Sequence, residues 1–582
     1  MDDNKSMLDR RSFLKGAAVA GAAAVGAGAL AACTPDAAGS GGSNAGGSGS
    51  GDSSGSGGSA TLDTSKYPAL ADSRNPIDWL GTPPALTPED CVETIEADVI
   101  VIGAAVAGEI AGYSAVKQGA KTILLERNGT AHISGSGIGF SNSKCQADQG
   151  QPPIDKYELY QLIFNQLQGR CAQDLLAAWV WHSGEVLDEI NEVILQPAGV
   201  IATATGEVPG PEKKYELMQN LASHVNFDDT GQDNLEVFNN LIHKWIEDNG
   251  GEIHYNTTAR VLTQDADGTV TGVIAQKDDD GDYVYYKASG GVVVATGSYG
   301  GNDEMMRAFA NPWLANYAKN FGVYNARVTE TSPITTKETM DDGTGHKMLC
   351  WAGAVMEQID PSFQSWEDTG YWWWPFLHVD TEGRRFRNEA SSWLDHTHLI
   401  AELPAGLNYY WQIIATNDFE MPGTLAPIPS SAWDEMVAMT SEVYTADTIE
   451  DLAAQIDIDP AVLRATVDRY NEICASGIDD DFGKLPKYLG PVEGAPYKAV
   501  KAQSHFYCTS SGVKIDRYCH VLDKNWEPIP HLFAAGNTVG WRLGSGYQMT
   551  VGGLCNGWAF FHGYVSGRVA AKSDWTFAEI GA

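Results

Sequence analysis

A glycine turn at residues 103–108 is the stretch whose residue types and spacing indicate chemistry most clearly. It reads Gly-Ala-Ala-Val-Ala-Gly, and an acid, Glu126, follows 23 residues after Gly103. Such a turn directs backbone N–H groups and the positive end of a helix dipole at a pyrophosphate, and the acid accepts the hydroxyls of an adenosine ribose. The pattern predicts a dinucleotide-binding site. Because Ala105 replaces the middle glycine of G-x-G-x-x-G, a plain strand-helix-strand unit is the alternative.

Three segments must position this turn. Residues 98–102 alternate β-branched and apolar side chains and are expected to form a buried parallel strand. The helix that follows is expected to run to about Gln118. Residues 121–125 are expected to form the second strand, which ends at Glu126. This order predicts a Rossmann-like α/β fold.

Further glycine turns follow predicted strands far along the chain. Residues 290–302, GGVVVATGSYGGN, and 529–537, IPHLFAAGN, each read as a buried strand entering a turn, and a glycine pair precedes an apolar helix expected at about 555–571. A Gly/Ser-rich loop at 133–143 lets backbone approach a flat ligand, although a surface loop would look the same. The predicted dinucleotide contacts are Gly103, Ala105, Ala107, Gly108, Glu126, Arg127, Ser134, Gly135, Ser136, Gly137, Ala295, Thr296, Gly297, Gly536, Asn537, Gly552 and Gly553.

The region between these turns reads first as helices and then as strands. Apolar residues at spacings of three and four predict helices from 155 to about 249, and strands are expected at 253–258, 270–276 and 283–287. His182 and His243 are interpreted as surface or core residues rather than ligands. The acidic turn at 278–281 lacks the downstream glutamate of a calcium loop, so no metal site is expected.

The N-terminal residues carry export signals. Arg10 and Arg11 fit the twin-arginine pattern, an uncharged Ala/Gly-rich run follows at 16–32, and Leu-Ala-Ala-Cys at 30–33 forms a lipobox. Cys33 would then be lipidated and anchor the protein to the extracytoplasmic face of the cell membrane. Residues 37–60 are a Gly/Ser tract, expected to act as a tether of roughly 25–30 Å root-mean-square reach.

The charge and the cysteines limit the possible functions. The formal net charge is −37, and removing residues 1–32, with three acids and four bases, leaves −38. Such acidity argues against nucleic acid and anionic lipid headgroups and favours a basic electron-transfer partner or simply a solvated surface. The nine cysteines show no C-x-x-C spacing, so haem and iron–sulfur motifs are not indicated.

The ordered set of motifs resembles a known family. DVIVIG followed by an acid, VVVATG-x-Y-G-G-N, EGRRFRNE, TSSGVKID and IPHLFAAGN look like the fumarate reductase / 3-ketosteroid delta-1-dehydrogenase flavoprotein family. The resemblance covers about residues 96–575 and implies FAD as the cofactor. It implies a Rossmann-like FAD-binding domain at 96–345 and 501–582, with an inserted α+β substrate-capping domain at 346–500. Residues 1–33 would be the signal peptide and lipobox, and 34–95 the linker and lead-in.

The resemblance also identifies where this chain departs from the family. Family fumarate reductases bind a dicarboxylate with a histidine pair and arginines and deliver a proton from an arginine. In this chain, the position of the proton-donating arginine holds Trp393 and that of the relay arginine holds Trp372. The position of the clamping arginine holds Tyr547, and that of the first residue of the histidine pair holds Tyr507. Charge-assisted bonds to a dianion are therefore lost, and aromatic replacements favour a bulky, planar, weakly charged substrate. Core packing of residues 371–374 is the alternative.

Tyr547 is the predicted catalytic residue. It follows Asn537 by ten residues, as in the ketosteroid dehydrogenase branch, where the tyrosine hydrogen-bonds the substrate ketone and stabilises an enolate. Its alternative role is packing beside the flavin. Tyr299, Tyr371 and Tyr507 are candidates for a second acid or base from residue type and region.

Together these features predict an FAD enzyme that reduces an activated C=C bond of a bulky enone-like substrate as an electron sink. Electrons would come from a membrane partner such as a quinol-linked cytochrome. The alternatives are a 3-ketosteroid delta-1-dehydrogenase-type desaturase and a solute-binding lipoprotein.

Overall fold

The protein is described from a computed structural model whose described residues begin at Asp78. They are 78–131, 138–200, 202–205, 224–227, 235–278, 281–309, 342–357, 363–367, 376–390, 409–415, 441–509, 511–544 and 551–581. The predicted signal peptide, anchor cysteine and tether therefore lie outside the described residues.

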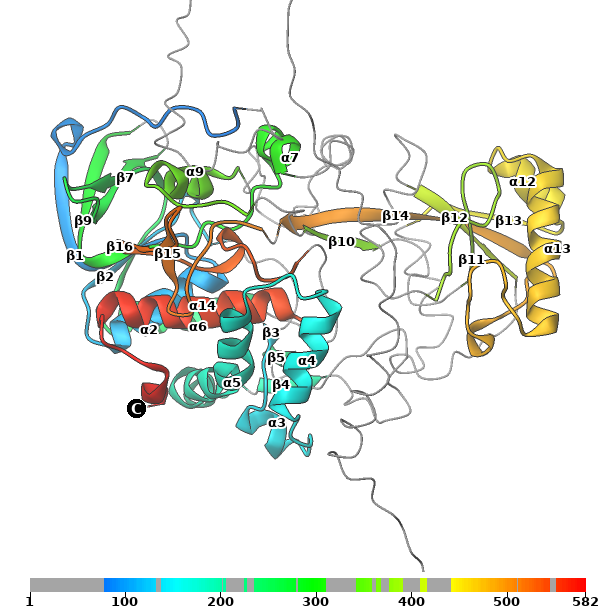
Figure 1. Ribbon diagram of the computed structural model, residues 1–582, viewed down its shortest axis with the longest axis horizontal. Helices are drawn as coiled ribbons and strands as arrows, with labels where there is room; N and C mark the ends of the chain where they lie inside the picture. Colours follow the sequence, from blue (N-terminus) through cyan, green and yellow to red (C-terminus); the bar gives the residue numbers. More distant parts are fainter. Residues whose placement is uncertain are drawn as a thin grey trace, which may run out of the picture. The chain divides into compact units, whose positions relative to one another are not determined.

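A mainly parallel sheet forms the larger layer (Figure 1). Its order is β15-β16-β9-β1-β2-β6, with β16, β9, β1, β2 and β6 parallel, while β8 pairs antiparallel with β9 and β7. The strands are β1 Glu93–Ile102, β2 Thr122–Leu125, β6 Glu252–His254, β7 Thr257–Gln264, β8 Val270–Lys277, β9 Tyr283–Val294, β15 His520–Leu522 and β16 Pro528–Ala534.

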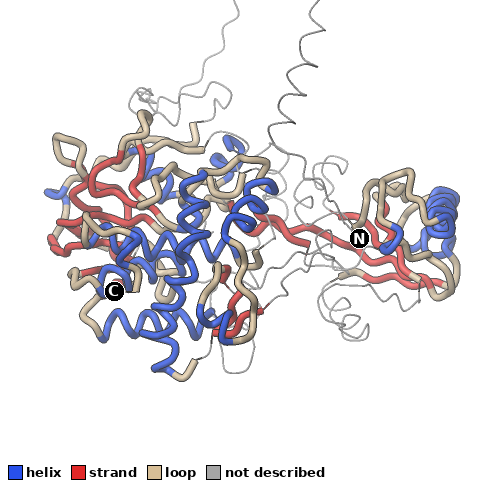
Figure 2. The backbone as a smooth tube through the Cα atoms, turned by 60° about the horizontal axis from the view of Figure 1, so that its bottom comes forward, coloured by secondary structure: helices blue, strands red, loops and turns tan. Residues whose placement is uncertain are grey.

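Helices pack on this sheet and on one another, as Figures 1 and 2 show. They are α2 Val106–Lys117, α5 Gln173–Ile190, α6 Leu235–Asp248 and α14 Leu554–Ala571. Residues 106–116 of α2 are all buried, so this helix reads as an interior helix rather than an amphipathic one. Glu189 of α5 accepts hydrogen bonds from Tyr113 of α2 and from Tyr564 and Arg568 of α14, which ties the three helices together.

The predicted strand-helix-strand unit and the C-terminal helix are confirmed within a few residues, whereas the strand predicted at 253–258 is divided between β6, which pairs with β2, and β7, which pairs with β8. Two further predictions are wrong. Residues 155–249 are not helical throughout: α4 Lys156–Gln166, α5 and α6 are interrupted by β4 Ala202–Thr205 and β5 His224–Phe227. These strands alternate polar and apolar residues over only four positions, too short to override the helical spacing around them. With β3 Ile138–Gly139 they form a three-stranded sheet beside α3 Lys144–Asp148.

The second error concerns β9. Residues 283–287 and 290–294 were predicted as separate segments because glycines punctuate a chain. They form one strand, which pairs with β1 from Glu93 opposite Val284 to Ile102 opposite Val294. A register shift between Ala97 and Val99 of β1 accommodates the glycine pair.

A second sheet lies in the inserted region. Its order is β10-β14-β12-β11, and β13 also pairs with β14. The elements of this region are β10 Phe363–Glu367, β11 Leu377–Val379, β12 Tyr409–Ile414, β13 Val443–Ala446, α12 Ile449–Gln455, α13 Pro460–Ser476 and β14 Tyr497–Thr509, preceded along the chain by α7 Asp303–Phe309 and α9 Thr344–Trp351. It has its own core, which includes Trp411, Leu463 and Val467. The predicted domain boundary at 500–501 falls inside β14.

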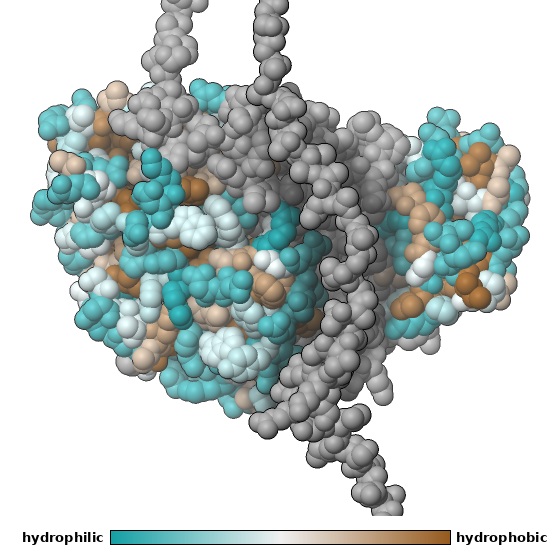
Figure 3. Space-filling view, viewed as in Figure 1, coloured by the Kyte–Doolittle hydropathy of each residue, from teal (hydrophilic) through white to brown (hydrophobic). Residues whose placement is uncertain are grey.

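Hydrophilic and hydrophobic residues are intermixed on the described part of the face in Figure 3. Within the described ranges, no helix has the length and apolar character needed to cross a membrane.

Candidate active site

The carboxyl ends of the central strands bring three glycine turns together. The N–H of Gly103 donates to Leu125 O at 2.8 Å, that of Ala295 to Ile102 O at 2.8 Å, and that of Ala535 to Val294 O at 3.0 Å. Each turn therefore begins against the last residue of a neighbouring strand. In an open parallel sheet, ligands bind in the crevice outside these strand ends.

The turn at 103–108 depends on close packing. Gly103 has φ +97°, and a Cβ built on Gly108 would lie 1.8 Å from the carbonyl oxygen of Gly103. Ala105, the N-cap of α2, has ordinary extended angles of φ −81° and ψ −173°, so alanine adopts this conformation without strain. The missing middle glycine therefore does not disturb the turn's backbone.

Glu126 lies at the end of β2 against this turn. Its Oε2 accepts the Ala104 N–H at 3.2 Å and its Oε1 accepts the Asn128 N–H at 3.0 Å. Burial raises the pKa of this carboxyl, and these N–H groups oppose the rise. The Asn128 side-chain amide also donates to Oε1 at 3.1 Å. A carboxylate has about four lone-pair positions, so room remains for one ribose hydroxyl.

His243, interpreted from the sequence as a surface or core residue, is buried and lies against the glycine turn. It lies on the buried face of α6, where its Nε2 is 2.9 Å from the Ala104 carbonyl oxygen and its Nδ1 is 3.2 Å from the Tyr255 hydroxyl. Burial lowers its pKa, so the neutral ring donates from Nε2 and accepts at Nδ1. The backbone of Ala104 is thus held at its N–H by Glu126 and at its C=O by His243. The sequence signal was the position of His243 beside Ile242 and Ile246 on the apolar face.

The second and third turns meet the start of α2 and α14. A Cβ on Gly536, which has φ +69°, would lie 2.9 Å from the Ala107 Cβ. The neighbouring Asn537 Oδ1 accepts from Arg542 Nη2 and from Cys555 Sγ, each at 3.0 Å. Arg542, which the sequence analysis did not single out, is buried beside Asn537.

The remaining predicted cofactor contacts divide into three groups. Gly553 accepts the Gly139 N–H at 3.0 Å, which places the glycine pair 552–553 beside β3. Arg127 forms an ion pair with Asp342 at 3.0 Å. Residues 134–137 lie outside the described residues.

These features fit FAD. The tight turn and the buried first turn of α2 offer unpaired helix N–H groups to a pyrophosphate, and Glu126 lies where the ribose would be. The turns at 295–297 and 536–537, and the glycine pair at 552–553, surround the same end of the sheet and would hold the rest of the cofactor.

Tyr299 lies in the core. Its side chain is fully buried, its hydroxyl is 2.5 Å from Ser511 Oγ, and its N–H donates to Thr509 Oγ1 at 3.1 Å. The ring of His346 meets it edge-on at 5.1 Å, and burial lowers the pKa of His346 to about 4. Burial also raises the pKa of Tyr299, so its hydroxyl keeps its proton.

The other predicted catalytic and pocket residues are not placed. Tyr547, Tyr371, Trp372 and Trp393 lie outside the described residues, and Tyr507 is described only as part of the backbone of β14. Their roles stay predictions.

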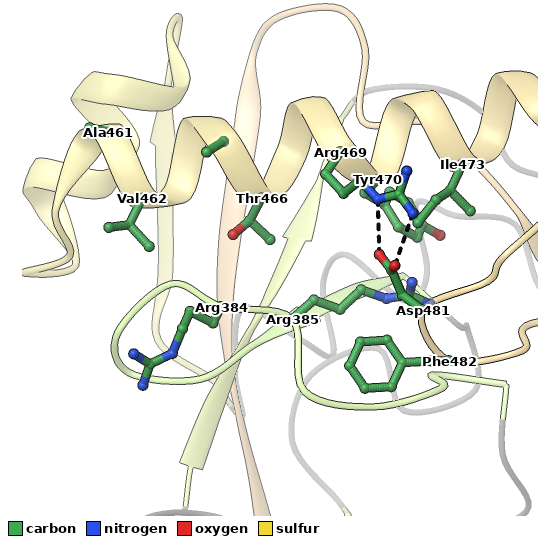
Figure 4. A pocket seen from close by; sticks show the side chains of 11 residues that line it. Arg384, Arg385, Ala461, Val462, Thr466, Arg469, Tyr470, Ile473, Asp481 and Phe482 are labelled. Atoms are coloured by element: carbon green, nitrogen blue, oxygen red, sulfur yellow. Dashed lines mark hydrogen bonds and ion pairs between the residues drawn. The ribbon is translucent and has the colours of Figure 1, made fainter.

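A cavity of about 520 Å³ lies in the inserted region, along α13 (Figure 4). Its lining includes Arg384, Arg385, Arg469, Tyr470 and Phe482 and none of the predicted site residues. The cations are already paired, since Arg469 donates to Asp481 and Arg385 donates to Glu389 and Asp479. We therefore do not assign the cofactor site to this cavity, and the strand ends remain the candidate site. Among the described residues, no group of three or more His, Cys, Asp or Glu side chains is placed to hold a metal ion.

Residues 98–554 match the family described as FAD binding domain, which is well over half of the chain. The chain belongs to this family. It is an FAD-dependent oxidoreductase, so the predicted cofactor, fold class and flavoprotein family are confirmed and the solute-binding alternative is set aside. Residues 7–27 match the twin-arginine translocation signal, which directs export across the cytoplasmic membrane.

Several characterised proteins are similar to this chain. The vinyl phenol reductase of Lactiplantibacillus plantarum is 25% identical over 510 residues, covering 82% of this chain and 96% of that protein. The digoxin reductase of Eggerthella lenta is 23% identical over 530 residues, covering 84% and 88%. The open conformation of a flavocytochrome c3 fumarate reductase shares the fold, with a TM-score of 0.63, 23% identity and coverage of 83% and 79%.

Proposed function

We propose that this protein reduces the activated C=C bond of a bulky, planar, weakly charged substrate at the outer face of the cell membrane, where Cys33 anchors it. The feature that carries the proposal is a match by sequence position: aromatic residues fall where fumarate reductases of the family have cations. Trp372, Trp393 and Tyr547 cannot form the charge-assisted bonds that hold a dicarboxylate.

Two of the relatives support this substrate class, although others are named as fumarate reductases. One is named for reducing vinyl phenol and another for reducing digoxin. Both names denote ring-bearing molecules rather than small dicarboxylates, and aromatic walls recognise such molecules by area and stacking. Arg542, which follows the turn at 536–537, donates to Val539 O at 2.8 Å and to Asn537 Oδ1 at 3.0 Å.

FAD, when bound at the strand ends, supplies the hydride. The chain's part is to orient the substrate, polarise it and supply a proton. In the proposal, the Tyr547 hydroxyl donates a hydrogen bond to the substrate carbonyl, so negative charge is stabilised where the enolate forms. The proton that completes the addition comes from a tyrosine, with Tyr371 and Tyr299 as candidates. Burial raises the pKa of Tyr299, which makes its hydroxyl a weaker proton donor than an ordinary tyrosine.

Electrons are proposed to come from a separate redox protein, such as a quinol-linked cytochrome. The cysteines show no haem or iron–sulfur spacing, and the net charge of −38 without residues 1–32 suits a basic partner. The Gly/Ser tract at 37–60 would give the catalytic body freedom to meet this partner.

The reverse reaction is the second candidate. The spacing of Asn537 and Tyr547 resembles the ketosteroid dehydrogenase branch, and the same hydrogen bond would stabilise an enolate during desaturation. An artificial electron acceptor with a saturated ketone would reveal this activity.

The test is a panel of acceptors mixed with chemically reduced holoenzyme, with flavin reoxidation followed by absorbance. Steroid enones, unsaturated lactones and aromatic acrylates are expected to reoxidise the flavin, and fumarate is not. Reoxidation by fumarate alone would overturn the proposal. Reduction of the oxidised enzyme by saturated ketosteroids, without reoxidation by any enone, would favour the desaturase.

A further inference from the structure

Glu357 is a buried acid that the scheme above does not use. It ends the short segment 355–357, whose Met356 bridges to Val513, and the Glu357 N–H donates to Gly512 O at 2.9 Å. Val513 in turn pairs with Val539, which closely follows the glycine turn at 536–537. Glu357 therefore ends the first of three segments that are paired through their backbones, and the third of them follows that turn.

The carboxylate of Glu357 reaches across to Trp541. Its Oε2 accepts the Trp541 N–H at 2.9 Å, and the Trp541 carbonyl oxygen accepts the Ala172 N–H at 2.6 Å. Trp541 has φ +54°, a left-handed conformation that bulky residues rarely adopt unless their surroundings hold them there. These bonds hold both the backbone N–H and the backbone C=O of Trp541.

The approach of the carboxylate requires a glycine. A Cβ on Gly540 would lie 2.8 Å from Glu357 Oε2 and 2.6 Å from Gly512 O. Immediately after Trp541, the Arg542 side chain turns back and donates to Asn537 Oδ1 at 3.0 Å. The left-handed residue thus sets the direction from which Arg542 meets Asn537.

We propose that Glu357 is a positioning residue for the FAD site. By accepting the Trp541 N–H, it holds the left-handed backbone that keeps Arg542 against Asn537, and so shapes the turn at 536–544 around the cofactor. The inference needs FAD binding and is independent of the substrate.

The electrostatic surroundings of Glu357 are mixed. Burial raises its pKa to about 7, while the Trp541 N–H and the cations Arg542, Arg170 and Lys514 oppose the rise. The hydroxyl of Tyr299 is also near enough for Glu357 to raise its pKa. Lys514 itself lies between the rings of Trp526 and Trp541, 4.0 and 4.7 Å from their centroids, with Asp174 nearby.

Two substitutions separate the hydrogen bond from the charge. Glu357→Gln keeps an oxygen that accepts the Trp541 N–H, whereas Glu357→Ala removes the acceptor. We expect Glu357→Ala to raise the apparent dissociation constant of FAD by about tenfold, the usual scale for a lost hydrogen bond to a charged group, and to change the visible circular dichroism of the bound flavin. Glu357→Gln should stay within about threefold of the wild type, as a partial loss of that bond allows.

A destabilised control distinguishes positioning from general unfolding. Asp479→Asn weakens the buried ion pair with Arg385 in the inserted region, and should lower the melting temperature while leaving the flavin spectrum unchanged. Unchanged FAD affinity in Glu357→Ala, equal loss in Glu357→Gln and Glu357→Ala, or equal loss in Asp479→Asn would each overturn the proposal.

A pH profile gives a second readout. Because the pKa of Glu357 is raised in the folded protein, its contribution to stability is full below about pH 4.5 and is lost as the pH rises through about 7. The melting temperature of Glu357→Gln relative to the wild type should therefore rise across this interval and level off above it. A difference that does not change with pH would show that Glu357 is not held in this buried environment.

Discussion

The two ends of the proposed FAD site are built in different ways. The adenosine end consists of one contiguous unit, from β1 through the turn at 103–108 to Glu126, with His243 added from α6. The other end, where we propose that the flavin lies, is assembled from segments near residues 299, 357, 512 and 541 that meet only in the folded protein. The first follows a local rule of glycine spacing and tolerates Ala105. The second depends on tertiary contacts, including a strained tryptophan and a buried acid.

Gly108→Ala should have the largest effect on FAD binding, because it changes a glycine of the turn at 103–108. The added Cβ would meet the carbonyl oxygen of Gly103 at 1.8 Å, and backbone cannot yield at that distance. We expect FAD to be lost on purification, with an affinity at least about 10²-fold weaker, measured as the ratio of flavin absorbance to protein. The matched control is Gly129→Ala, where the Cβ would make only a 3.6 Å contact with Asn256 and flavin content should be normal. Normal flavin content in Gly108→Ala would contradict the adenosine-end assignment.

Tyr547→Phe tests the flavin end. If the hydroxyl stabilises an enolate, turnover should fall by about 10²-fold while flavin content is unchanged. Tyr444→Phe is the control, since its hydroxyl contacts only exposed Glu442 in the described residues, and its turnover should match the wild type. Equal turnover in Tyr547→Phe would discard the catalytic role.

His243→Leu should have an intermediate effect. It removes the donor to the Ala104 carbonyl oxygen and the acceptor for Tyr255, so FAD affinity should fall about tenfold, as expected for lost buried hydrogen bonds. His243→Gln, which can donate to the same carbonyl, should lose less. If both variants retain the wild-type affinity for FAD, measured by isothermal titration calorimetry, His243 is only a core residue. The adenosine end would then depend on the contiguous unit from β1 to Glu126 alone.

Trp393→Arg should have the smallest effect. A single restored cation supplies a proton donor without the carboxylate clamp, so fumarate turnover should stay at background. Appreciable fumarate reduction in this variant, measured as reoxidation of reduced flavin, would show that the rest of the dicarboxylate site is still present.

The sequence predicted the parts of the fold that obey local rules. The strand at 98–102, the helix to about Gln118 and the acid at 126 were found because their spacing repeats over a few residues. Strands β4 and β5 were missed because four residues cannot outweigh a helical pattern, and β9 was divided because its glycines look like a turn from the sequence alone.

The candidate site was predictable only in part. Glycine turns at 103, 295 and 536 could be placed because parallel strands end at one edge of a sheet. Glu357 and Arg542 could not, because their importance comes from contacts with Trp541 and Asn537. No periodicity in the sequence encodes those contacts.

The proposed substrate class is tested most directly by comparing two acceptors for the reduced flavin. Dithionite-reduced holoenzyme is mixed with a planar steroid enone or with fumarate at equal concentration, and the recovery of oxidised flavin absorbance is timed. We expect rapid recovery with the enone and recovery at the background rate with fumarate. Rapid recovery with fumarate and none with the enone would contradict the proposed substrate class.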